Sequence, residues 1–417
     1  MTDAMREHAA RILQVTPYPT IDPRHGGQIR SAQIAAELRA AGYEVKSVAV
    51  YVADDYPQAG EDDIAFDSKS EYWHDDLPWL SDYYSGVFGA RDVKASARLQ
   101  AVINGYRPQA VVVEQPWLFK AVQRVAPPGT KLIYSSQNIE WRLKDKLFAR
   151  TGHPQRETLI EAIREMEHAA ARDAHLVVAC TESDLAYYRD VSGKPAFNGV
   201  VAGNGVEPFS CTPQRVAEWL AFFSRPIPVF VSSAHLPNAQ GFWDMMAPGL
   251  TFLRPDEDIL VVGGVSSIIM QAPGYQRYAD VNLSRLNIAG PREKTELQAL
   301  VRASHVVLLP ITDGEGSNLK TAEALESGCP IVATSKAFRG FEAAMSLPHV
   351  QIADNARDFR VAVRRALDRP RKTDATPLEV RSKYYWQHQL KGFVEAMRPL
   401  SEARATAAKA SAAAAVR

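Results

Sequence analysis

The sequence predicts an α/β protein with two doubly wound, parallel-sheet domains. Short apolar runs of strand length alternate with segments of helical composition along most of the chain. Several of these runs end in glycine or in a small polar loop, which is typical of the carboxyl ends of strands in open parallel sheets. The length of 417 residues corresponds to about two domains, so the chain can bury two separate cores.

Composition narrows the class of protein. The 48 basic residues balance the 48 acidic ones, which favours neither a nucleic-acid-binding surface nor an enzyme for acidic substrates. Three widely spaced cysteines, Cys180, Cys211 and Cys329, lack the pairing of a zinc site, so we expect a reducing compartment and no structural metal. The charged N-terminal stretch does not fit a signal peptide, and no apolar run approaches the roughly 20 residues of a membrane span. We expect a cytoplasmic protein.

The first half begins as strand, glycine loop, helix and strand. Residues 11–15 predict a strand, Gly26 and Gly27 end the following loop, a helix covers residues 28–41, and a second strand covers residues 45–52. This is not the GxGxxG fingerprint, which counts against a nicotinamide enzyme. Two glycines before a helix fit close approach to a diphosphate, and a flexible turn explains them as well.

Residues 53–90 form an acidic, aromatic insertion that we predict to be an irregular functional loop facing an acceptor. Its aromatic cluster leaves peripheral membrane association open, although a lipid anchor would prefer lysine and arginine beside the aromatics. The later elements of this half are predicted as a helix at 91–106, strands at 110–113 and 131–134, a helix at 157–172, a strand at 175–179, a helix capped by Thr181, and a strand that ends at the turn Asn204-Gly205-Val206.

The second half repeats the alternation. Its strands are predicted at residues 228–232, 259–262, 286–289, 306–309 and 331–333, and its helices at 239–253, 293–303, 318–327, 355–367 and 378–400. The Ala-rich end has little apolar surface to bury and is predicted to be disordered. The predicted divisions are therefore a first domain at 1–205, a second at 206–377, a C-terminal helix at 378–400 and a tail at 401–417.

The stretch 306–334 holds the candidate site. A buried strand leads into a loop with Gly314 and Gly316, and a helix follows with Ser317 as its predicted cap. The free amides of its first turn form an anion site, and a bound anion would remove the conflict between Lys320 and the helix dipole. Glu315 and Glu323 place carboxylates on either side, ready for hydroxyl groups. This pattern fits a nucleotide diphosphate sugar, and a capped surface helix with solvated charges also explains it.

A family resemblance rests on these residues. Glu315, the segment GSNLK, Glu323-Ala324 and SGCPIVAT resemble the donor-binding signature of retaining GT-B glycosyltransferases of family 4, of the polysaccharide and lipopolysaccharide sugar transferase type. The glycine pair and the Asn-Gly-Val turn are similar to the same family. The resemblance implies two Rossmann-like domains facing each other across a cleft. It further implies transfer of a sugar to a hydroxyl of a glycan or lipid-linked acceptor with retained configuration, without a metal or another cofactor.

The resemblance also implies roles for individual residues. Glu323 would bind the ribose hydroxyls, Glu315 the hydroxyls of the transferred sugar, and Lys320 the phosphates together with the helix amides. The residues implied as catalytic are Glu315, Lys320 and Gln137. The residues implied as donor-binding are Gly26, Gly27, Arg30, Ser233, His235, Gly290, Gly316, Ser317, Asn318, Leu319 and Glu323.

The sequence departs from the family at two places. Gln137 stands where a histidine is frequent, and residues 232–238 lack the arginine and lysine that neutralise the leaving diphosphate. His235, Lys320 or Arg30 would then carry the positive charge, although a lone loop histidine is commonly structural. Two alternatives therefore stay open: a nucleotide-sugar-binding subunit without turnover, and a nucleotide-sugar epimerase. The expected partners are donor and acceptor, not nucleic acid, in the cytoplasm or at the inner face of the membrane.

Overall fold

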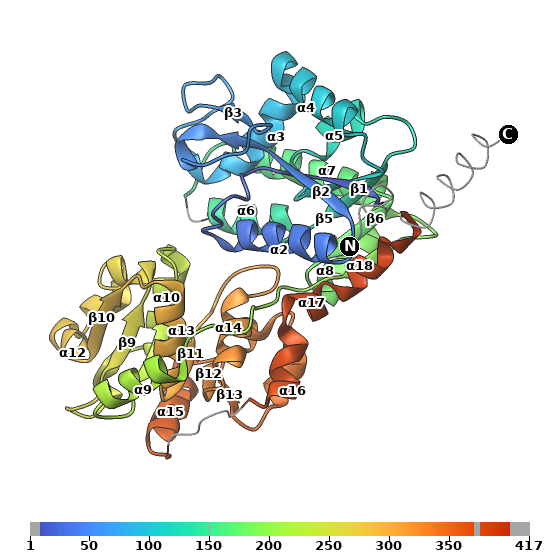
Figure 1. Cartoon of the computed structure of the whole chain (residues 1–417). Coiled ribbons are helices and arrows are strands. Elements are labelled where there is room, and N and C mark those ends of the chain that lie inside the picture. The colour runs from blue at the N-terminus through green and yellow to red at the C-terminus, as the bar shows by residue number, and fades with distance from the viewer. Residues whose placement is uncertain (1–8, 150, 371–375, 401–417) are drawn as a thin grey trace. The chain divides into compact units, whose positions relative to one another are not determined.

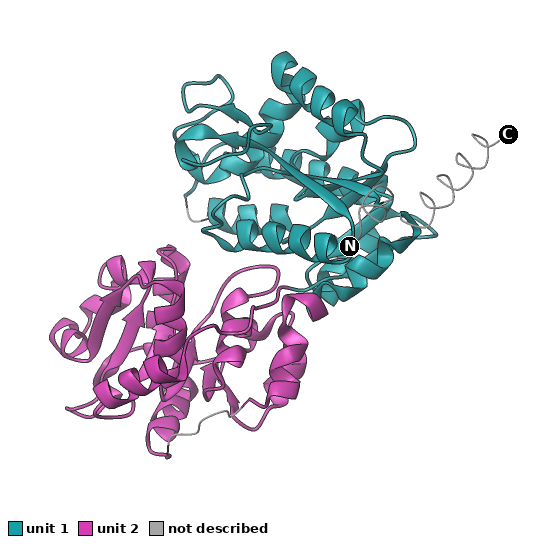
Figure 2. Cartoon of the chain, viewed as in Figure 1, with its two compact units in different colours: residues 1–203, 389–417 teal, residues 204–388 magenta. Residues whose placement is uncertain are grey.

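The computed structural model describes residues 9–149, 151–370 and 376–400. The chain separates into two compact units (Figure 2): unit 1 comprises residues 1–203 and 389–417, and unit 2 comprises residues 204–388. The division between Gly203 and Asn204 lies two residues before the predicted one. The prediction for the tail at 401–417 concerns residues outside the described ranges.

Unit 1 is built on a seven-stranded parallel sheet with helices on both faces (Figure 1). The strand order is β3-β2-β1-β4-β5-β6-β7, so the chain winds outward from β1 in one direction and from β4 in the other. The strands are β1 (Arg11–Thr16), β2 (Glu44–Val52), β3 (Ile64–Phe66), β4 (Ala110–Glu114), β5 (Lys131–Ser135), β6 (Leu176–Ala179) and β7 (Gly199–Val201).

The helices of unit 1 connect these parallel strands. They are α2 (Gly26–Ala40), α3 (Ser81–Arg91), α4 (Val93–Tyr106), α5 (Phe119–Val125), α6 (Glu140–Ala149), α7 (Arg156–Asp173), α8 (Glu182–Ser192) and α18 (Lys391–Ala396). The predicted threonine cap is confirmed, because the Thr181 side chain accepts the Asp184 amide at 3.1 Å.

The insertion at 53–90 is not the irregular loop that the sequence predicts. Its strand β3 pairs in parallel with β2, and its helix α3 buries Tyr84 and Phe88 in the core of unit 1. Short 3₁₀ turns at Ala53–Asp55 and Pro78–Leu80 join these pieces. These aromatic residues pack in the core of unit 1. The acidic residues between them hide the apolar pattern of a strand and a helix in the sequence.

Unit 2 repeats this topology with six parallel strands in the order β10-β9-β8-β11-β12-β13. The strand order therefore reverses between β8 and β11. Its strands are β8 (Pro228–Val231), β9 (Ile259–Val262), β10 (Leu286–Gly290), β11 (Val306–Leu309), β12 (Ile331–Ala333) and β13 (Val350–Ile352). Its helices are α9 (Pro213–Phe222), α10 (Leu236–Met246), α11 (Pro273–Gln276), α12 (Ala279–Ser284), α13 (Lys294–Ala303), α14 (Leu319–Ser327), α15 (Ala356–Leu367) and α16 (Leu378–Arg381).

The single C-terminal helix predicted at 378–400 is wrong. The chain forms α16, a 3₁₀ turn at Ser382–Tyr384, α17 (Trp386–Gln389) and α18. The backbone is extended at Tyr385, where it pairs with Val206, and the Val206 amide donates to the Tyr384 carbonyl at 2.9 Å. This pairing takes the segment out of helical conformation. Residues up to His388 belong to unit 2, and the chain belongs to unit 1 from Gln389 onward.

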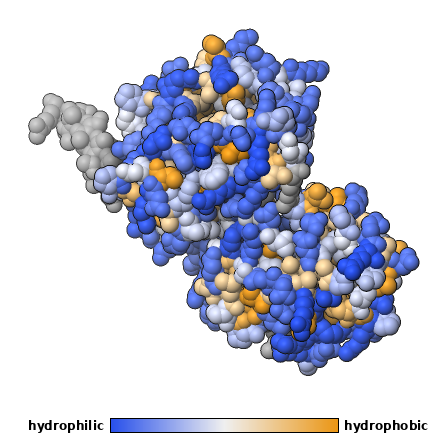
Figure 3. Space-filling view, turned by 180° about the vertical axis from the view of Figure 1, so that it is seen from behind, coloured by the Kyte–Doolittle hydropathy of each residue, from blue (hydrophilic) through white to orange (hydrophobic). Residues whose placement is uncertain are grey.

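The face in Figure 3 is mostly hydrophilic with apolar residues scattered over it. Large exposed apolar side chains among the described residues, such as Val93, Phe222 and Leu236, belong to different elements. No helix in the described ranges combines the length and the apolar character that crossing a bilayer requires.

Candidate functional site

The reversal of strand order in unit 2 brings two predicted loops together. β8 pairs directly with β11, so the loop that leads into α10 leaves the sheet beside the loop that leads into α14. Ligands of open α/β sheets bind outside the carboxyl ends of the strands at such a reversal. The topology therefore places Ser233 and His235, on the first loop, next to the helix start that carries Lys320.

The loop after β8 has a defined shape. Ser233 and His235 are exposed to solvent. The Asn238 side-chain amide donates to the Ser233 carbonyl at 3.1 Å and to the Ser233 Oγ at 3.2 Å, which closes the loop over the start of α10. A Cβ atom on Gly264 would lie 2.8 Å from the Ala234 nitrogen, so the neighbouring loop after β9 packs on this one only because it carries glycine.

Asn238 also joins the two loops of the reversal. The Lys320 Nζ atom donates to the Asn238 Oδ1 atom at 3.3 Å. Burial lowers the pKa of Lys320, and the nearby Glu323 carboxylate opposes this shift. The ammonium group that the sequence predicts for the phosphates therefore lies at the reversal. The sequence prediction does not include Asn238 among the site residues, although the Pro-Asn pair that follows two serines is a signal for it.

Arg339 holds the loop before α14 from behind. Its Nε atom donates to the Gly316 carbonyl at 2.9 Å and its Nη2 atom to the Glu315 carbonyl at 2.9 Å. Its Nη1 atom donates to the Gly314 carbonyl. One guanidinium group thus binds three successive backbone carbonyls. The sequence prediction missed Arg339, because nothing near residue 339 indicates a partner in that loop.

This arrangement sets the direction of the backbone amides. In a planar trans peptide the N–H points opposite to the C=O, so the amides of Glu315, Gly316 and Ser317 point away from Arg339. Gly314 and Gly316 have φ angles of 128° and 63°, which allow successive carbonyls to turn to the same side. No described residue accepts a hydrogen bond from the amides of Gly316 and Ser317. Successive amides that point to one side are the groups from which proteins build anion sites.

The cap of α14 differs from the prediction. Asn318, not Ser317, is the N-cap, and its Oδ1 atom accepts the Lys320 amide at 3.2 Å. The Ser317 hydroxyl instead accepts the Asn204 amide at 3.1 Å, and the Asn204 side chain donates to the Ser317 carbonyl at 3.0 Å. The helix begins at Leu319, one residue later than predicted. Asn204, the first residue of unit 2, is therefore bonded to the segment that leads into this helix. The sequence did not predict this contact.

The two predicted carboxylates lie at different positions along this segment. Glu315 is partly buried in the loop, and Glu323 lies one helical turn beyond Lys320. The protein around Glu323 raises the pKa of its carboxyl, and Lys320 and Lys294 counteract the rise. The Glu323 side chain nevertheless keeps contact with solvent, so it is accessible to a ligand.

Gly290 ends the edge strand β10, two strands away from β8. Its φ angle of 68° suits glycine, its carbonyl accepts the Gly263 amide at 2.9 Å, and its own amide donates to the Ser266 hydroxyl at 3.2 Å. These bonds give Gly290 a structural role at the strand end. Its contact with a donor stays a prediction.

The predicted glycine pair of unit 1 is part of a helix, not of the preceding loop. α2 begins at Gly26, and neither Gly26 nor Gly27 has a positive φ angle, so the turn explanation is wrong. A Cβ atom on Gly27 would lie 2.6 Å from the Tyr18 Oη atom and 2.7 Å from the Gln137 Oε1 atom. Gly27 is required for this close packing. Gly26 is exposed at the helix start, and its contact with a donor stays a prediction.

The structure corrects the role predicted for Arg30. Its side chain is only 1% exposed, and its guanidinium donates to the carbonyls of Ala202 at 2.7 Å and Gly203 at 3.2 Å. Burial raises the pKa of the nearby Glu114 carboxyl, and the Arg30 guanidinium opposes this rise. Arg30 holds the end of unit 1 together and is not accessible to a phosphate.

Gln137 is likewise corrected from a catalytic to a structural role. The residue is 8% exposed. Its amide nitrogen donates to the Tyr18 hydroxyl at 2.7 Å, with the Ser31 hydroxyl at 3.3 Å. Both donors therefore face the interior of unit 1, where a histidine of different shape would not make the same bonds. The Gln137 side chain therefore has no amide donor left for a substrate.

Unit 1 also buries carboxyl groups at the ends of β4 and β5. Burial raises the pKa of Glu140 to about 8, opposed by the ammonium of Lys144. Burial raises the pKa of Glu167 to about 7, although Glu167 accepts hydrogen bonds from the Tyr188 hydroxyl at 2.6 Å and from the Glu140 amide at 2.9 Å. Within the described ranges, no group of three or more His, Cys, Asp or Glu side chains is arranged to hold a metal ion.

Comparison with protein families gives two matches. Residues 25–205 match the glycosyl transferase 4-like domain, and residues 225–369 match the glycosyl transferases group 1 domain. The two matched regions correspond to unit 1 and unit 2. No curated protein sequence matches the chain.

Comparison with solved structures shows the same two-domain fold. Sucrose-phosphate synthase from Thermosynechococcus elongatus aligns with a TM-score of 0.70 and 16% identity over 94% of this chain and 100% of that one. Anabaena Alr3699/HepE in complex with UDP and glucose gives a TM-score of 0.62 and 14% identity over 93% and 99%. WaaG, a glycosyltransferase involved in lipopolysaccharide biosynthesis, gives 0.57 and 14% over 92% and 95%. At these identities the similarity shows the fold alone.

Proposed function

The chain belongs to the family 4-like glycosyltransferases of the GT-B fold, and from this we propose that it transfers a hexose from a nucleotide diphosphate sugar to a hydroxyl of a glycan or lipid-linked acceptor. Glycosyl transfer follows from the family. The donor class is supported by one observation above all: the loop whose carbonyls Arg339 binds leads directly into the helix turn of Lys320, and Lys320 bonds to Asn238 of the neighbouring loop at the strand reversal of unit 2.

These groups would act on the leaving diphosphate. Negative charge develops on its bridging oxygen as the glycosidic bond breaks, and positive groups already aimed at that charge lower the barrier. The amides of Gly316 and Ser317 and the Lys320 ammonium would supply this stabilisation without a divalent metal. Lys320 and Asn238 would move together, because their hydrogen bond joins the two loops.

The carboxylates would select the donor. Glu323 keeps solvent contact one turn into α14 and would accept the ribose hydroxyls, whereas Glu315 would accept hydroxyls of the transferred sugar. A carboxylate repels a diphosphate, but it accepts hydrogen bonds from hydroxyl groups. Glu315 and Glu323 would therefore favour ligands that carry hydroxyl groups on both sides of the phosphates. By resemblance to the family, transfer would retain the anomeric configuration.

Two structural neighbours support the choice of ligands. The HepE structure is in complex with UDP and glucose, and WaaG is involved in lipopolysaccharide biosynthesis. We place acceptor binding on unit 1 and reaction in the cytoplasm, either free or at the inner face of the membrane. A nucleic-acid partner is not expected, since acidic and basic residues balance.

Product analysis tests the activity. Thermal-shift screening against UDP-, GDP-, ADP- and dTDP-sugars identifies the donor, because a ligand of the native state raises the melting temperature. The chosen donor is then incubated with and without a saccharide acceptor, and the products are followed by NMR. Acceptor-dependent release of nucleoside diphosphate with a retained anomeric signal is expected. Binding without release would favour the inactive binding subunit, and conversion of the donor alone would favour the epimerase.

Glu323→Ala tests the donor site itself. Loss of a charged partner for the ribose hydroxyls should weaken nucleotide binding by about 1–3 kcal/mol, measured by calorimetry. The matched control is Glu379→Ala, which removes an exposed helical glutamate elsewhere in unit 2. Equal affinities of both variants would remove Glu323 from the site.

A further inference from the structure

Helix α15 presents arginines on its outer face, away from the strand reversal. The helix packs on unit 2 with its apolar residues, which are Phe359, Ala362, Val363, Ala366 and Leu367. Arg357, Val361 and Arg365 follow one another at intervals of four residues, so they form one line along the exposed side. Arg369 continues this line just beyond the end of the helix. We call these four residues the α15 row.

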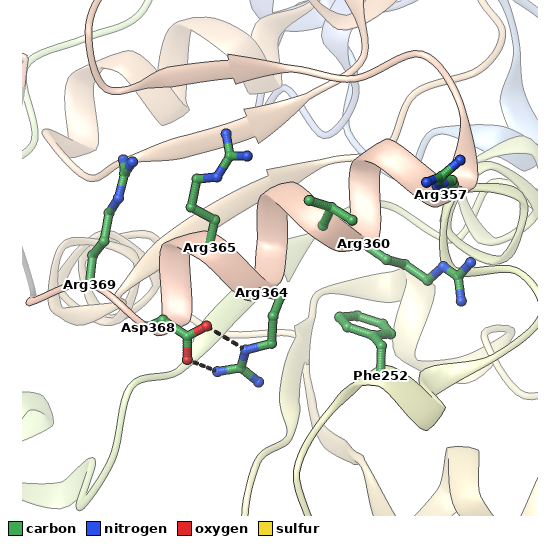
Figure 4. A pocket seen from close by; sticks show the side chains of 8 residues that line it. Phe252, Arg357, Arg360, Arg364, Arg365, Asp368 and Arg369 are labelled. Carbon is green, nitrogen blue, oxygen red and sulfur yellow. Dashed lines mark hydrogen bonds and ion pairs between the residues drawn. The ribbon is translucent and has the colours of Figure 1, made fainter.

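The α15 row borders a hollow of about 670 Å³. The hollow is lined by Phe252, Arg357, Arg360, Val361, Arg364, Arg365, Asp368 and Arg369 (Figure 4). In Figure 4, Arg365 and Arg369 extend in the same direction, whereas Arg364 lies on the other side of the helix and pairs with Asp368. Five arginines and a single carboxylate give this surface a strong excess of positive charge.

The arginines differ in their partners, and Arg360 donates through Nε to the Ala356 carbonyl at 3.2 Å. Arg364 is neutralised, since its Nη2 atom lies 2.7 Å from the Glu257 Oε1 atom and 3.1 Å from Asp368. The three arginines of the α15 row are exposed, and no described residue forms a hydrogen bond or an ion pair with their side chains. Arg365 lies in the last turn of α15 and Arg369 just beyond its end, so two like charges without an acidic partner in the described ranges lie close together there. An anionic partner would remove that repulsion.

We propose that the α15 row docks unit 2 onto a membrane surface containing anionic phospholipids. Arg357 and Arg365 are eight residues apart in α15, or roughly 12 Å along the axis at about 1.5 Å per residue, and Arg369 follows beyond the helix end, so the row is too long for a single phosphate and suits an array of headgroups. Val361 is 49% exposed within the row, and Phe252 lines the hollow, so apolar groups lie among the charges as in interfacial helices. Binding to the membrane does not depend on the proposed function. Its advantage to the enzyme, which is access to a lipid-linked acceptor, does rest on the proposed function.

The size of the effect follows from surface electrostatics. Each arginine near an anionic leaflet contributes about 1 kcal/mol, or about fivefold in partitioning. Removal of three unpaired arginines should therefore weaken vesicle binding about a hundredfold. Because these charges are exposed, salt should weaken the binding of the unaltered protein as well.

Vesicle co-sedimentation of the full chain tests the proposal. The vesicles contain phosphatidylcholine alone or with about one quarter phosphatidylglycerol, in a buffer of about 0.1 M salt. The test variant is Arg357→Gln/Arg365→Gln/Arg369→Gln. The control variant, Arg91→Gln/Arg189→Gln/Arg277→Gln, removes the same charge from exposed positions outside the hollow. Nucleotide binding in the absence of vesicles is measured for each protein and should stay unchanged.

The expected result is binding to the anionic vesicles only, lost about a hundredfold in the α15 variant and retained in the control. Failure of the unaltered protein to bind, or equal losses in both variants, would overturn the proposal. Calorimetry with inorganic pyrophosphate and filter binding with a DNA duplex test the other anions. Binding of either one that depends on the α15 row, together with no binding to vesicles, would assign the hollow to that ligand instead. None of these outcomes depends on sugar transfer.

Discussion

The two sheets reverse their strand order at equivalent places, between β1 and β4 in unit 1 and between β8 and β11 in unit 2, but the two reversals hold different groups. In unit 1, Gln137 is bonded to Tyr18, which follows β1, and Arg30 is bonded to the carbonyl of Ala202, which follows β7. In unit 2, Arg339 takes the carbonyls and leaves the amides before α14 open. Topology thus provides the location, and side chains decide whether a ligand can occupy it.

The same comparison separates the two glycine-containing helix starts that the sequence predicts. A glycine that precedes or opens a helix occurs at both reversals. Gly27 admits a tyrosine and a glutamine of the same chain, whereas Gly316 turns the backbone so that successive amides point to one side. The glycine alone therefore does not distinguish a binding site from close packing. Four predictions test this difference, from the largest expected effect to the smallest.

Lys320→Ala should give the largest loss. It removes the ammonium at the unit 2 reversal, and loss of one group that stabilises developing negative charge typically lowers kcat by about 10²–10³. Steady-state release of nucleoside diphosphate measures this effect. Lys391→Ala, which removes an exposed lysine on α18, is the matched control and should keep full activity. Comparable rates for the Lys320 variant and the unaltered protein would refute the assignment of the unit 2 reversal as the reaction centre.

Arg339→Ala should weaken nucleoside diphosphate binding by about 1.4–2.7 kcal/mol, or ten- to a hundredfold, since three carbonyls lose a charged donor and the amides lose their common direction. Calorimetry with the nucleoside diphosphate measures the affinity. Arg339→Lys supplies a charge but not the three-way fork, so it should restore only part of the loss. Full restoration by lysine would show that charge alone, and not the loop conformation, is required.

Gln137→Ala tests whether Gln137 has a structural role in unit 1. It should lower the free energy of unfolding by about 1–2 kcal/mol, because the Tyr18 and Ser31 hydroxyls lose a buried partner. The rate per folded molecule should stay within about twofold. Chemical denaturation and initial rates separate the two effects. A large fall in kcat with unchanged stability would return Gln137 to the catalytic role that the sequence suggested.

Glu140→Gln should give the smallest effect on activity, and its effect on stability should depend on pH. The folded state keeps the Glu140 proton up to about pH 8, whereas the unfolded chain releases it near the ordinary value of 4.5. The stabilisation contributed by the neutral carboxyl is therefore complete below about pH 4.5 and is lost as pH rises toward about 8. Glutamine cannot ionise. The melting temperature of the variant relative to the unaltered protein should rise by at least about 2–4 °C between pH 5 and pH 8 and then level off.

The dependence of this melting-temperature difference on pH tests whether Glu140 is neutral in the folded state. A difference in melting temperature that does not change with pH would show that Glu140 is ionised in the folded state, in spite of its burial. Glu167→Gln is the comparison variant. It loses acceptor capacity toward the Tyr188 hydroxyl and the Glu140 amide, so it should lower the melting temperature at every pH.

Local pattern predicted many elements well. The strands β9, β11 and β12 have the predicted bounds, since each is a fully apolar run and glycine or proline follows or precedes it. The strand β3 was missed because only three residues, Ile64–Phe66, pair with β2, within a segment of acidic and aromatic residues. The helix predicted at 378–400 failed because helical composition does not reveal the bridge between Tyr385 and Val206.

The candidate site divides in the same way. Lys320, Gly316 and the two glutamates follow one another in sequence, so local spacing was enough to predict them, and their contact with a donor stays a prediction. Arg339, Asn238 and Asn204 were missed, because their partners lie 24, 82 and 113 positions away in the chain. Arg30 and Gln137 were assigned to a ligand because sequence does not show burial.

By itself the sequence determined the alternation of strands and helices, the presence of two domains and the glycine-containing helix start with Lys320, because each depends on residues close together in the chain. Only the tertiary structure decided how the polar groups at the two equivalent strand reversals are bonded within the protein. That outcome depends on whether distant side chains use up the polar groups at the strand ends or orient them outward, as Gln137 does in unit 1 and Arg339 does in unit 2.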